Sequence, residues 1–261
     1  MKACKGLFMK DLYLFKNSFL VWIVIVAIAG IAATVIARYT SEPAAYVMLF
    51  PLFMMFHFAF IPVMMLEQLN REGKSQLWLY NPQRASMLVL SKLAAAIVYH
   101  FFTSILIAAY PAFVYLIYRS KGTMEPFKEV FSSSLWLSYG LTIFVLSIYA
   151  ALWVIFFWCV YHYLAKFPAI KKARWLILIL LFAALNYAET FTSRLLEQLS
   201  ATDYKFNVYL NLIFSYDRGS GWEAAVQSTS VPYVAVALHI LIGAALFYIS
   251  CWLLDRKVEV Q

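Results

Sequence analysis

The sequence predicts an all-α integral membrane protein with six transmembrane helices. Of the 261 residues, 64% are hydrophobic and 13% are charged, whereas a soluble domain is about half apolar and about a quarter charged. A helix needs about 20 mostly apolar residues to cross a bilayer, and six such runs occur, at 19–36, 46–66, 93–118, 135–164, 175–188 and 231–254. A β-barrel would alternate polar and apolar residues, whereas these runs are continuous. We therefore expect a single transmembrane domain over residues 1–261.

Residues 1–17 predict an amphipathic helix that lies on the inner membrane surface before the first span. At about 100° per residue, four lysines share one arc, and six apolar side chains share the other: Cys4, Leu7, Phe8, Leu12, Leu14 and Phe15. Asp11 falls within the apolar arc, where a carboxylate needs a basic or hydrogen-bonding partner. Two interpretations remain open: either the helix is frayed and Asp11 lies in headgroup water, or Asp11 forms an ion pair with a neighbouring helix.

The distribution of Lys and Arg predicts the orientation of the chain. If the N-terminus is cytoplasmic, 14 of the 21 Lys and Arg residues fall inside and 7 fall outside. The positive-inside rule then places both termini in the cytoplasm, and we expect a multi-pass protein of the bacterial plasma membrane. The net charge of +8 is explained by this topology and by anionic lipid, and no basic-aromatic module for nucleic acid is seen.

The connection 67–87, EQLNREGKSQLWLYNPQRASM, is the most informative segment. Its spacing predicts a short amphipathic helix with an apolar knob of Leu69, Leu77, Trp78 and Tyr80, ended by Asn81 and Pro82. The sequence EGKS within it is not a phosphate-binding loop, because position 68 is Gln rather than the required Gly. The knob can insert into a groove on a partner, or the helix can rest on lipid headgroups, where Trp and Tyr are equally favoured.

The segment 189–230 is expected on the outer side. SRLLEQL and YLNLIFSY carry apolar residues at helical spacing, and DRGSG between 217 and 221 predicts a turn. We expect two short re-entrant helices there, since helices satisfy their own backbone groups in lipid. A loop that rests on the protein surface is the alternative.

A family resemblance rests on two stretches. GKSQLWLYNPQRASMLVLSKLAAA resembles the connection between the second and third spans of type-2 ABC transporter permeases, and GLFMKDLYLFKNS is similar to the amphipathic N-terminal helix of that family. The matching positions in the connection are Glu72, Gly73, Leu77, Leu79, Pro82, Arg84, Ser86, Ser91 and Lys92. Six spans and cytoplasmic termini agree with the same family.

The resemblance implies the membrane subunit of an ATP-driven exporter, built from two permease chains, identical or different, and two separate ATPase chains. Segment 67–87 would be the coupling helix that contacts the ATPase, through Glu72, Gly73, Leu77, Trp78, Tyr80 and Arg84. ATP and Mg²⁺ would bind only in the partner, so this chain would be no enzyme and would carry no cofactor.

The cargo is indicated by the aromatic second span. We expect Phe53, Phe56, His57 and Phe60 to line the translocation path, which would suit a peptide, an antibiotic or a lipid-like molecule. These side chains can also simply pack the spans or face lipid. Sugar-polymer exporters carry similar spans, so that cargo class stays open.

Two rival functions come from other classes. Four histidines lie in or near spans, and paired His residues can hold haem in a helix bundle. The expected depths match only for His100 and His162, with His57 near mid-membrane and His239 towards the outside. An intramembrane enzyme is the second rival, although no zinc-protease spacing is found. Cys4, Cys159 and Cys251 are scattered, which predicts packing roles rather than a disulfide framework or a metal site.

Overall fold

A computed structural model describes residues 2–40, 44–75, 83–118, 133–199, 205–217 and 221–256. The helices are α1 (Lys2–Thr40), α2 (Ala44–Ser75), α3 (Ala85–Tyr118), α4 (Ser133–Leu164), α5 (Arg174–Leu199) and α6 (Tyr233–Arg256), and the short 3₁₀ helix η3 (Lys171–Ala173) precedes α5. Two strands, β1 (Lys205–Asp217) and β2 (Gly221–Pro232), lie between α5 and α6.

Five helices are long and apolar enough to cross a membrane by length and composition, among the residues that the structure describes. Their candidate spans are Cys4–Ile36, Ala85–Tyr110, Leu137–Leu164, Lys171–Thr192 and Tyr233–Asp255. This confirms the helical, multi-pass, membrane-embedded character that the composition predicts. The remaining apolar run, 46–66, lies within α2, and its crossing of the membrane stays a prediction.

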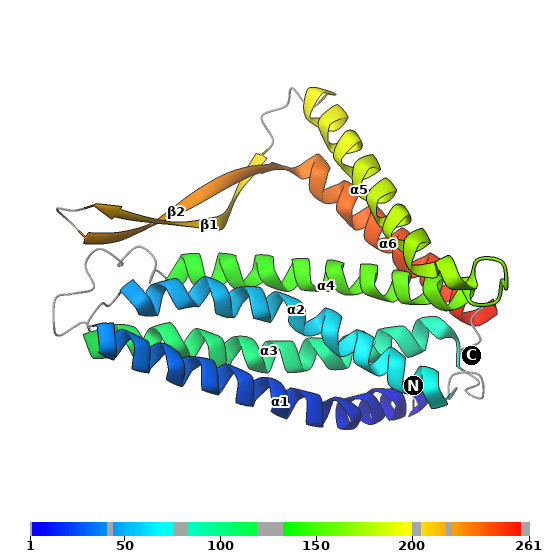
Figure 1. Cartoon of the computed structure of the whole chain (residues 1–261), viewed down its shortest axis with the longest axis horizontal. Coiled ribbons are helices and arrows are strands. Elements are labelled where there is room, and N and C mark those ends of the chain that lie inside the picture. The colour runs from blue at the N-terminus through cyan, green and yellow to red at the C-terminus, as the bar shows by residue number, and fades with distance from the viewer. Residues whose placement is uncertain are drawn as a thin grey trace.

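Helices α1 to α4 run side by side as a bundle, while α5 and α6 slant across one flank of it (Figure 1). The N-terminal end of α1 and the C-terminal end of α6 lie at the same end of this bundle, and the β-strands lie towards the opposite end. The placement of both termini in the cytoplasm stays a prediction.

The larger core lies between α1, α2, α3, α4 and α6. Its buried side chains include Phe15, Phe60, Met65, Leu69, Val89, Ile155, Cys159 and Cys251. Cys159 and Cys251 therefore have the packing role expected for them, whereas Cys4 is exposed. Large apolar side chains such as Ile28, Leu180 and Leu241 are exposed on the outer faces of the helices, where lipid would surround them.

The segment between α5 and α6 differs from the expected pair of re-entrant helices. SRLLEQL continues α5 as far as Leu199, but the residues after it form an antiparallel β-hairpin, with Lys205 paired to Pro232 and Asp217 paired to Gly221. The physical reason lies in the period of the sequence. Every even position from 206 to 216 is apolar, while Lys, Asn, Asn, Ser and Asp occupy odd positions, and this alternation among aromatic and β-branched residues is typical of a strand.

Candidate functional site

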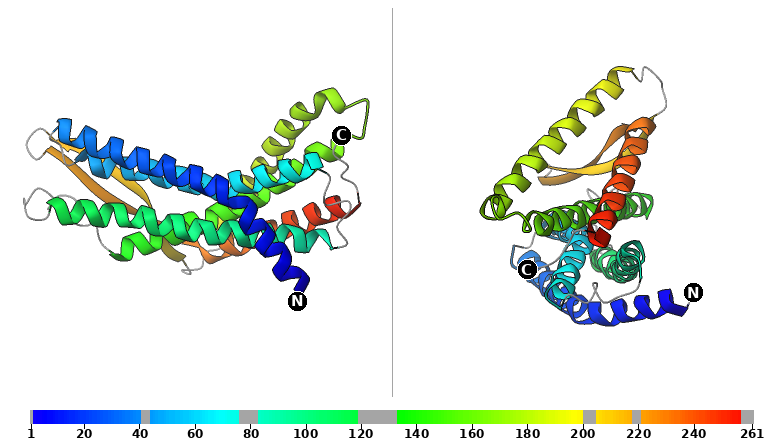
Figure 2. Two further views of the ribbon diagram at one scale, coloured as in Figure 1. Left: turned by 90° about the horizontal axis from the view of Figure 1, so that it is seen from below. Right: turned by 90° about the vertical axis from the view of Figure 1, so that its right-hand side faces the viewer.

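Helix α1 runs unbroken through the predicted surface helix and the first span, and its first part is angled to the rest (Figure 2). The apolar arc of this first part contacts protein: Phe15 is buried in the core, and Phe8 and Leu12 pack against it. The hydroxyl of Tyr99 on α3 donates a hydrogen bond of 2.9 Å to the backbone oxygen of Leu12. The N-terminal helix is therefore docked on α3 through its apolar face.

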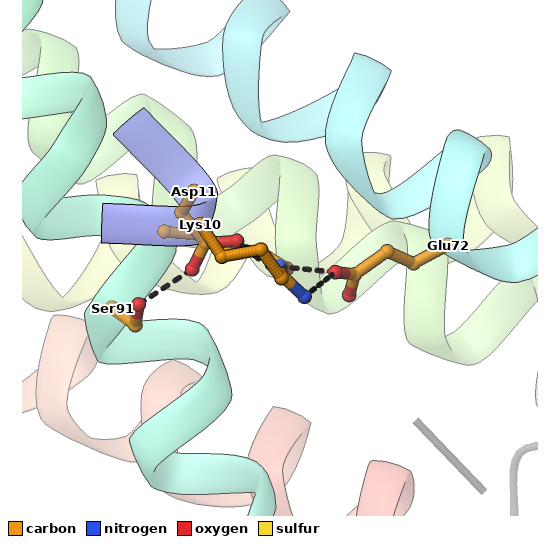
Figure 3. Close-up of polar contacts among 5 residues, drawn as sticks. Lys10, Asp11, Glu72 and Ser91 are labelled. Atoms are coloured by element: carbon orange, nitrogen blue, oxygen red, sulfur yellow. Dashed lines mark hydrogen bonds and ion pairs between the residues drawn. The ribbon is translucent and has the colours of Figure 1, made fainter. Parts of the chain in front are cut away.

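A buried ion cluster joins the first part of α1, the end of α2 and the beginning of α3 (Figure 3). Lys92 Nζ lies 2.9 Å from Asp11 Oδ1 and 2.8 Å from Glu72 Oε1. Lys10 Nζ contacts the same Glu72 oxygen at 2.7 Å, and the Ser91 hydroxyl donates to Asp11 Oδ2 at 2.5 Å. Asp11 therefore forms the ion pair to a neighbouring helix, which is the second of the two interpretations left open by the sequence.

The buried ion cluster is electrically balanced, and three of its four charged side chains are almost closed to solvent, while the Lys10 side chain is 39% exposed. Asp11, Lys92 and Glu72 are 1%, 2% and 4% exposed, and two lysines face two carboxylates. A buried ion pair contributes little net stability, because desolvation offsets the attraction, but removal of one partner strands a buried charge. The cluster therefore fixes how α1, α2 and α3 meet, since few other arrangements would keep every charge paired.

The electrostatics of Glu72 predict a pH dependence of stability. Burial raises the pKa of this carboxyl, but the charges and hydrogen bonds of Lys92 and Lys10 outweigh burial and hold the pKa below its ordinary value. A lowered pKa in the folded state means that Glu72 stabilises the fold above the ordinary carboxyl pKa, and that this stabilisation is lost as the pH falls through the folded value.

We expect acidification to lower the unfolding temperature of the wild-type protein in detergent, and we expect Glu72→Gln to weaken that dependence. Thermal unfolding over a series of pH values tests this. Glu67→Gln, which removes the exposed carboxylate of the Glu67–Arg71 pair on the same helix, serves as the control. If the unfolding temperature falls equally steeply with decreasing pH in wild type and in Glu72→Gln, Glu72 does not cause the pH dependence.

A second contact secures the start of α3. Arg84, which precedes α3, has no side-chain oxygen with which to accept the free backbone N–H groups of the first turn. Asp255, in the last turn of α6, provides this oxygen, because its Oδ1 accepts the N–H of Ala85 at 2.8 Å. Glu72 therefore anchors the end of α2, and Asp255 of α6 anchors the start of α3. These two positions flank the segment that connects α2 to α3.

Loss of this contact gives a measurable prediction. Asp255→Ala should lower the free energy of unfolding by about 1 kcal/mol, the typical cost of removing a helix cap. Asp255→Asn keeps an oxygen acceptor and should stay close to wild type. Thermal unfolding measures the stability of both variants. If Asp255→Asn loses as much stability as Asp255→Ala, the side-chain oxygen at position 255 does not stabilise the start of α3.

The structure separates the expected ATPase-contact residues into three groups. Glu72 and Gly73 are buried at the end of α2, and Arg84 is exposed before α3. Leu77, Trp78 and Tyr80 lie outside the described residues. The pairing of Lys92 with Asp11 could have been found in the sequence only by noticing that two unmatched charges, one in an apolar arc and one in an apolar helix, would neutralise each other.

The expected path residues do not share one environment. Phe53, His57 and Phe60 are buried between neighbouring helices, while Phe56 is half exposed. Phe60 contacts Trp22 of α1 edge to face, with ring centroids 5.2 Å apart. Three of the four residues therefore pack the interior of this chain.

The pairing of the histidines differs from the expected depths. His57 stacks on His100, with ring centroids 3.9 Å apart and planes 11° apart, whereas the ring of His162 contacts Trp158, with centroids 4.2 Å apart and planes tilted by 48°. The structure therefore places His57 and His100 side by side, although their expected depths differed. Axial haem ligation aims two ring nitrogens at one iron, but this pair turns ring faces towards each other and His57 Nε2 contacts Ser104 Oγ at 2.7 Å. This geometry does not fit haem.

Comparison with known proteins shows a family relationship. No family model matches the chain. The uncharacterized protein YhcE of Bacillus subtilis (strain 168) is 31% identical over 262 residues, and the match covers 100% of both chains. Because the identity extends over the whole length of both proteins, the chain belongs to the same family as YhcE.

Proposed function

We propose that this chain is the membrane-spanning subunit of an ATP-driven ABC exporter in the bacterial plasma membrane, with segment 67–87 as its coupling helix. The observation that carries the proposal is the charged frame around that segment. We use this name for the buried ion cluster of Lys10, Asp11, Glu72, Ser91 and Lys92 together with the contact between Asp255 and Ala85. The resemblance of the segment to type-2 permeases supplies the assignment.

The charged frame suits a part that transmits force. A push on segment 67–87 reaches α2 and α3 directly, α1 through Asp11 and Lys10, and α6 through Asp255. A further hydrogen bond of 2.8 Å, from Trp158 Nε1 to Asn70 Oδ1, ties the end of α2 to α4. Movement of one short segment would therefore displace five helices together.

Leu69, expected as part of the apolar knob, is 2% exposed and packs in the core of this chain, so it is not available to a partner. We therefore assign the partner contact to Leu77, Trp78 and Tyr80, which lie outside the described residues, and to Arg84, which is exposed before α3. Glu72 and Gly73 are buried, so we assign them to positioning the segment rather than to touching the partner. ATP binding and hydrolysis in the partner would shift two permease chains between inward-facing and outward-facing states.

The assembly we propose contains two ATPase subunits and a second permease chain, identical or different. Six spans complete the path, with 46–66 in α2 as the second. An amphipathic or hydrophobic cargo fits the aromatic second span, with a peptide, an antibiotic or a lipid-like molecule as the class to test.

Purification of the full chain from membranes of its own host tests the proposal. We expect an ABC-type ATPase to co-purify in stoichiometric amount, and the reconstituted complex to hydrolyse ATP in proteoliposomes. The proposal would be contradicted if deletion of the gene impaired transport in the host, while the full chain purified from that host carried no ATPase.

A further inference from the structure

A second group of ionisable residues lies within candidate spans, away from the charged frame. Glu189 Oε1 on α5 is 2.9 Å from His239 Nε2 on α6, and the Tyr149 hydroxyl on α4 donates to the same oxygen at 3.2 Å. The ring of Tyr149 lies edge to face with His239, at 5.5 Å between centroids. Ionisable side chains within a membrane are costly to keep, and they usually serve a function.

The contacts of His239 define how many protons it holds. Its Nδ1 is 2.6 Å from the backbone oxygen of Ala235, and because a carbonyl oxygen only accepts, Nδ1 must carry a hydrogen. The neutral imidazole then has a bare lone pair on Nε2, facing Glu189 Oε1. If Glu189 is ionised, two acceptors confront each other at 2.9 Å.

One additional proton removes this conflict. It can reside on Nε2, which gives an imidazolium facing a carboxylate, or on Glu189, which gives a carboxylic acid that donates to the neutral imidazole. In both cases the pair is electrically neutral and Nε2 and Oε1 share a hydrogen bond. With one proton more than a neutral histidine and an ionised glutamate hold, the pair can keep both the 2.9 Å contact to Glu189 and the 2.6 Å contact to Ala235.

The packing of α4 against α6 brings Tyr149 to this pair. Gly243 lies one turn after His239, and a Cβ at this position would stand 3.3 Å from Leu152 Cδ1 and 3.8 Å from Tyr149 Cδ2. Since Gly243 has no side chain, α4 approaches α6 closely enough for the Tyr149 hydroxyl to reach Glu189.

Helix α5 has few other anchors near this position. Figure 1 shows it slanting away from α4, and its aromatic contacts with α4, Trp175 with Tyr161 and Phe182 with Phe157, lie nearer its start. Beyond them, Tyr187 and Phe191 are exposed. The contact of Glu189 with His239 and Tyr149 thus decides whether this part of α5 stays against α4 and α6.

We propose that Glu189, His239 and Tyr149 form a proton-binding site that fastens α5 to α4 and α6 while the proton is bound. When the pH rises and the proton leaves, the neutral imidazole has one N–H for two acceptors, the Ala235 oxygen and Glu189. It then gives up one of these contacts, and the contact that fastens α5 weakens. When the pH falls, the hydrogen bond remains, because a protonated imidazole still donates to a carboxylic acid oxygen.

The charged groups around His239 do not provide an alternative partner. Glu189 comes from α5 and Tyr149 from α4, while β2, which leads into α6, ends in QSTSVP without a titratable side chain. The exposed Lys205 on β1 is in register with Pro232, and Arg194 on α5 is exposed beyond Glu189. Among the residues that the structure describes, no other base faces His239, so the proton would exchange with solvent and the bulk pH would be the controlling variable.

Distance measurement between α5 and α6 tests the proposal. Spin labels at the exposed positions Tyr187 and Tyr248, in a full-length chain whose three native cysteines are replaced, report the separation in nanodiscs. We expect the wild-type distance to lengthen as the pH is raised from acidic to alkaline values.

Glu189→Gln is the decisive variant. A glutamine amide donates to neutral Nε2 without any added proton, so the distance should stay short at every pH, whereas Glu189→Ala should be long throughout. A wild-type distance that does not change with pH would overturn the proposal, and so would a Glu189→Gln protein that follows the wild-type curve.

Discussion

Lys92→Met should destabilise the protein by about 3–5 kcal/mol, the cost of breaking a buried ion pair by removing one partner. Lys92 is the cation shared by Asp11 and Glu72, and methionine fills a similar volume without charge. Asp11 would then keep only the Ser91 hydroxyl and the more distant Lys10, whose Nζ is 3.9 Å from its Oδ1. Chemical or thermal unfolding in detergent measures the loss.

Two controls isolate the effect of burial. Glu67→Gln removes the charge of an exposed pair on α2, and such pairs contribute only about 0.3–0.5 kcal/mol. Addition of Asp11→Asn to Lys92→Met removes one stranded charge and should recover part of the stability, which a double-mutant cycle quantifies. If Lys92→Met unfolds like wild type, the buried ion cluster does not hold the three helices together.

Trp78→Ala and Tyr80→Asp should uncouple the proposed ATPase from the permease. Aromatic residues at the centre of an interface commonly cost about 2 kcal/mol or more when truncated, which is about a thirtyfold loss of affinity. Tyr80→Asp adds a charge to the same apolar knob and should have at least as large an effect. Transport-coupled ATP hydrolysis and ATPase affinity in proteoliposomes provide the measurement.

Trp175→Ala is the matched control, because Trp175 is an exposed tryptophan at the start of α5 rather than in segment 67–87. It should leave ATPase affinity unchanged, and all three variants should insert into the membrane normally. Wild-type affinity in both Trp78→Ala and Tyr80→Asp would remove these residues from the contact.

The apolar runs predicted most of the helices because lipid leaves the backbone few alternatives. A continuous run in hydrocarbon must satisfy its N–H and C=O groups internally, so length and composition suffice for the candidate spans. The hairpin was missed because YLNLIFSY fits helical spacing when taken alone. The alternation that marks β1 extends over 205–217, and it favours a strand only when this longer window is considered with the turn at DRGSG.

The candidate site could be predicted only in part. Asp11 stood out because a carboxylate in an apolar arc requires a partner, but its partner Lys92 is 81 residues away, and no local pattern specifies such a contact. The capping of α3 by Asp255 spans 170 residues and left no signal besides the absence of a capping residue at Arg84. The residue types indicate that Asp11 and the first turn of α3 need partners. Only tertiary packing determines that these partners are Lys92 and Asp255.

Photo-crosslinking from position 78 tests the central claim most directly. A photoreactive phenylalanine analogue in place of Trp78, activated in membranes of the native host, reports what the apolar knob of segment 67–87 contacts. We predict a crosslinked product that contains an ABC-type ATPase and whose yield changes when ATP is added. Crosslinks to lipid alone, from a chain that is active in its host, would contradict the account.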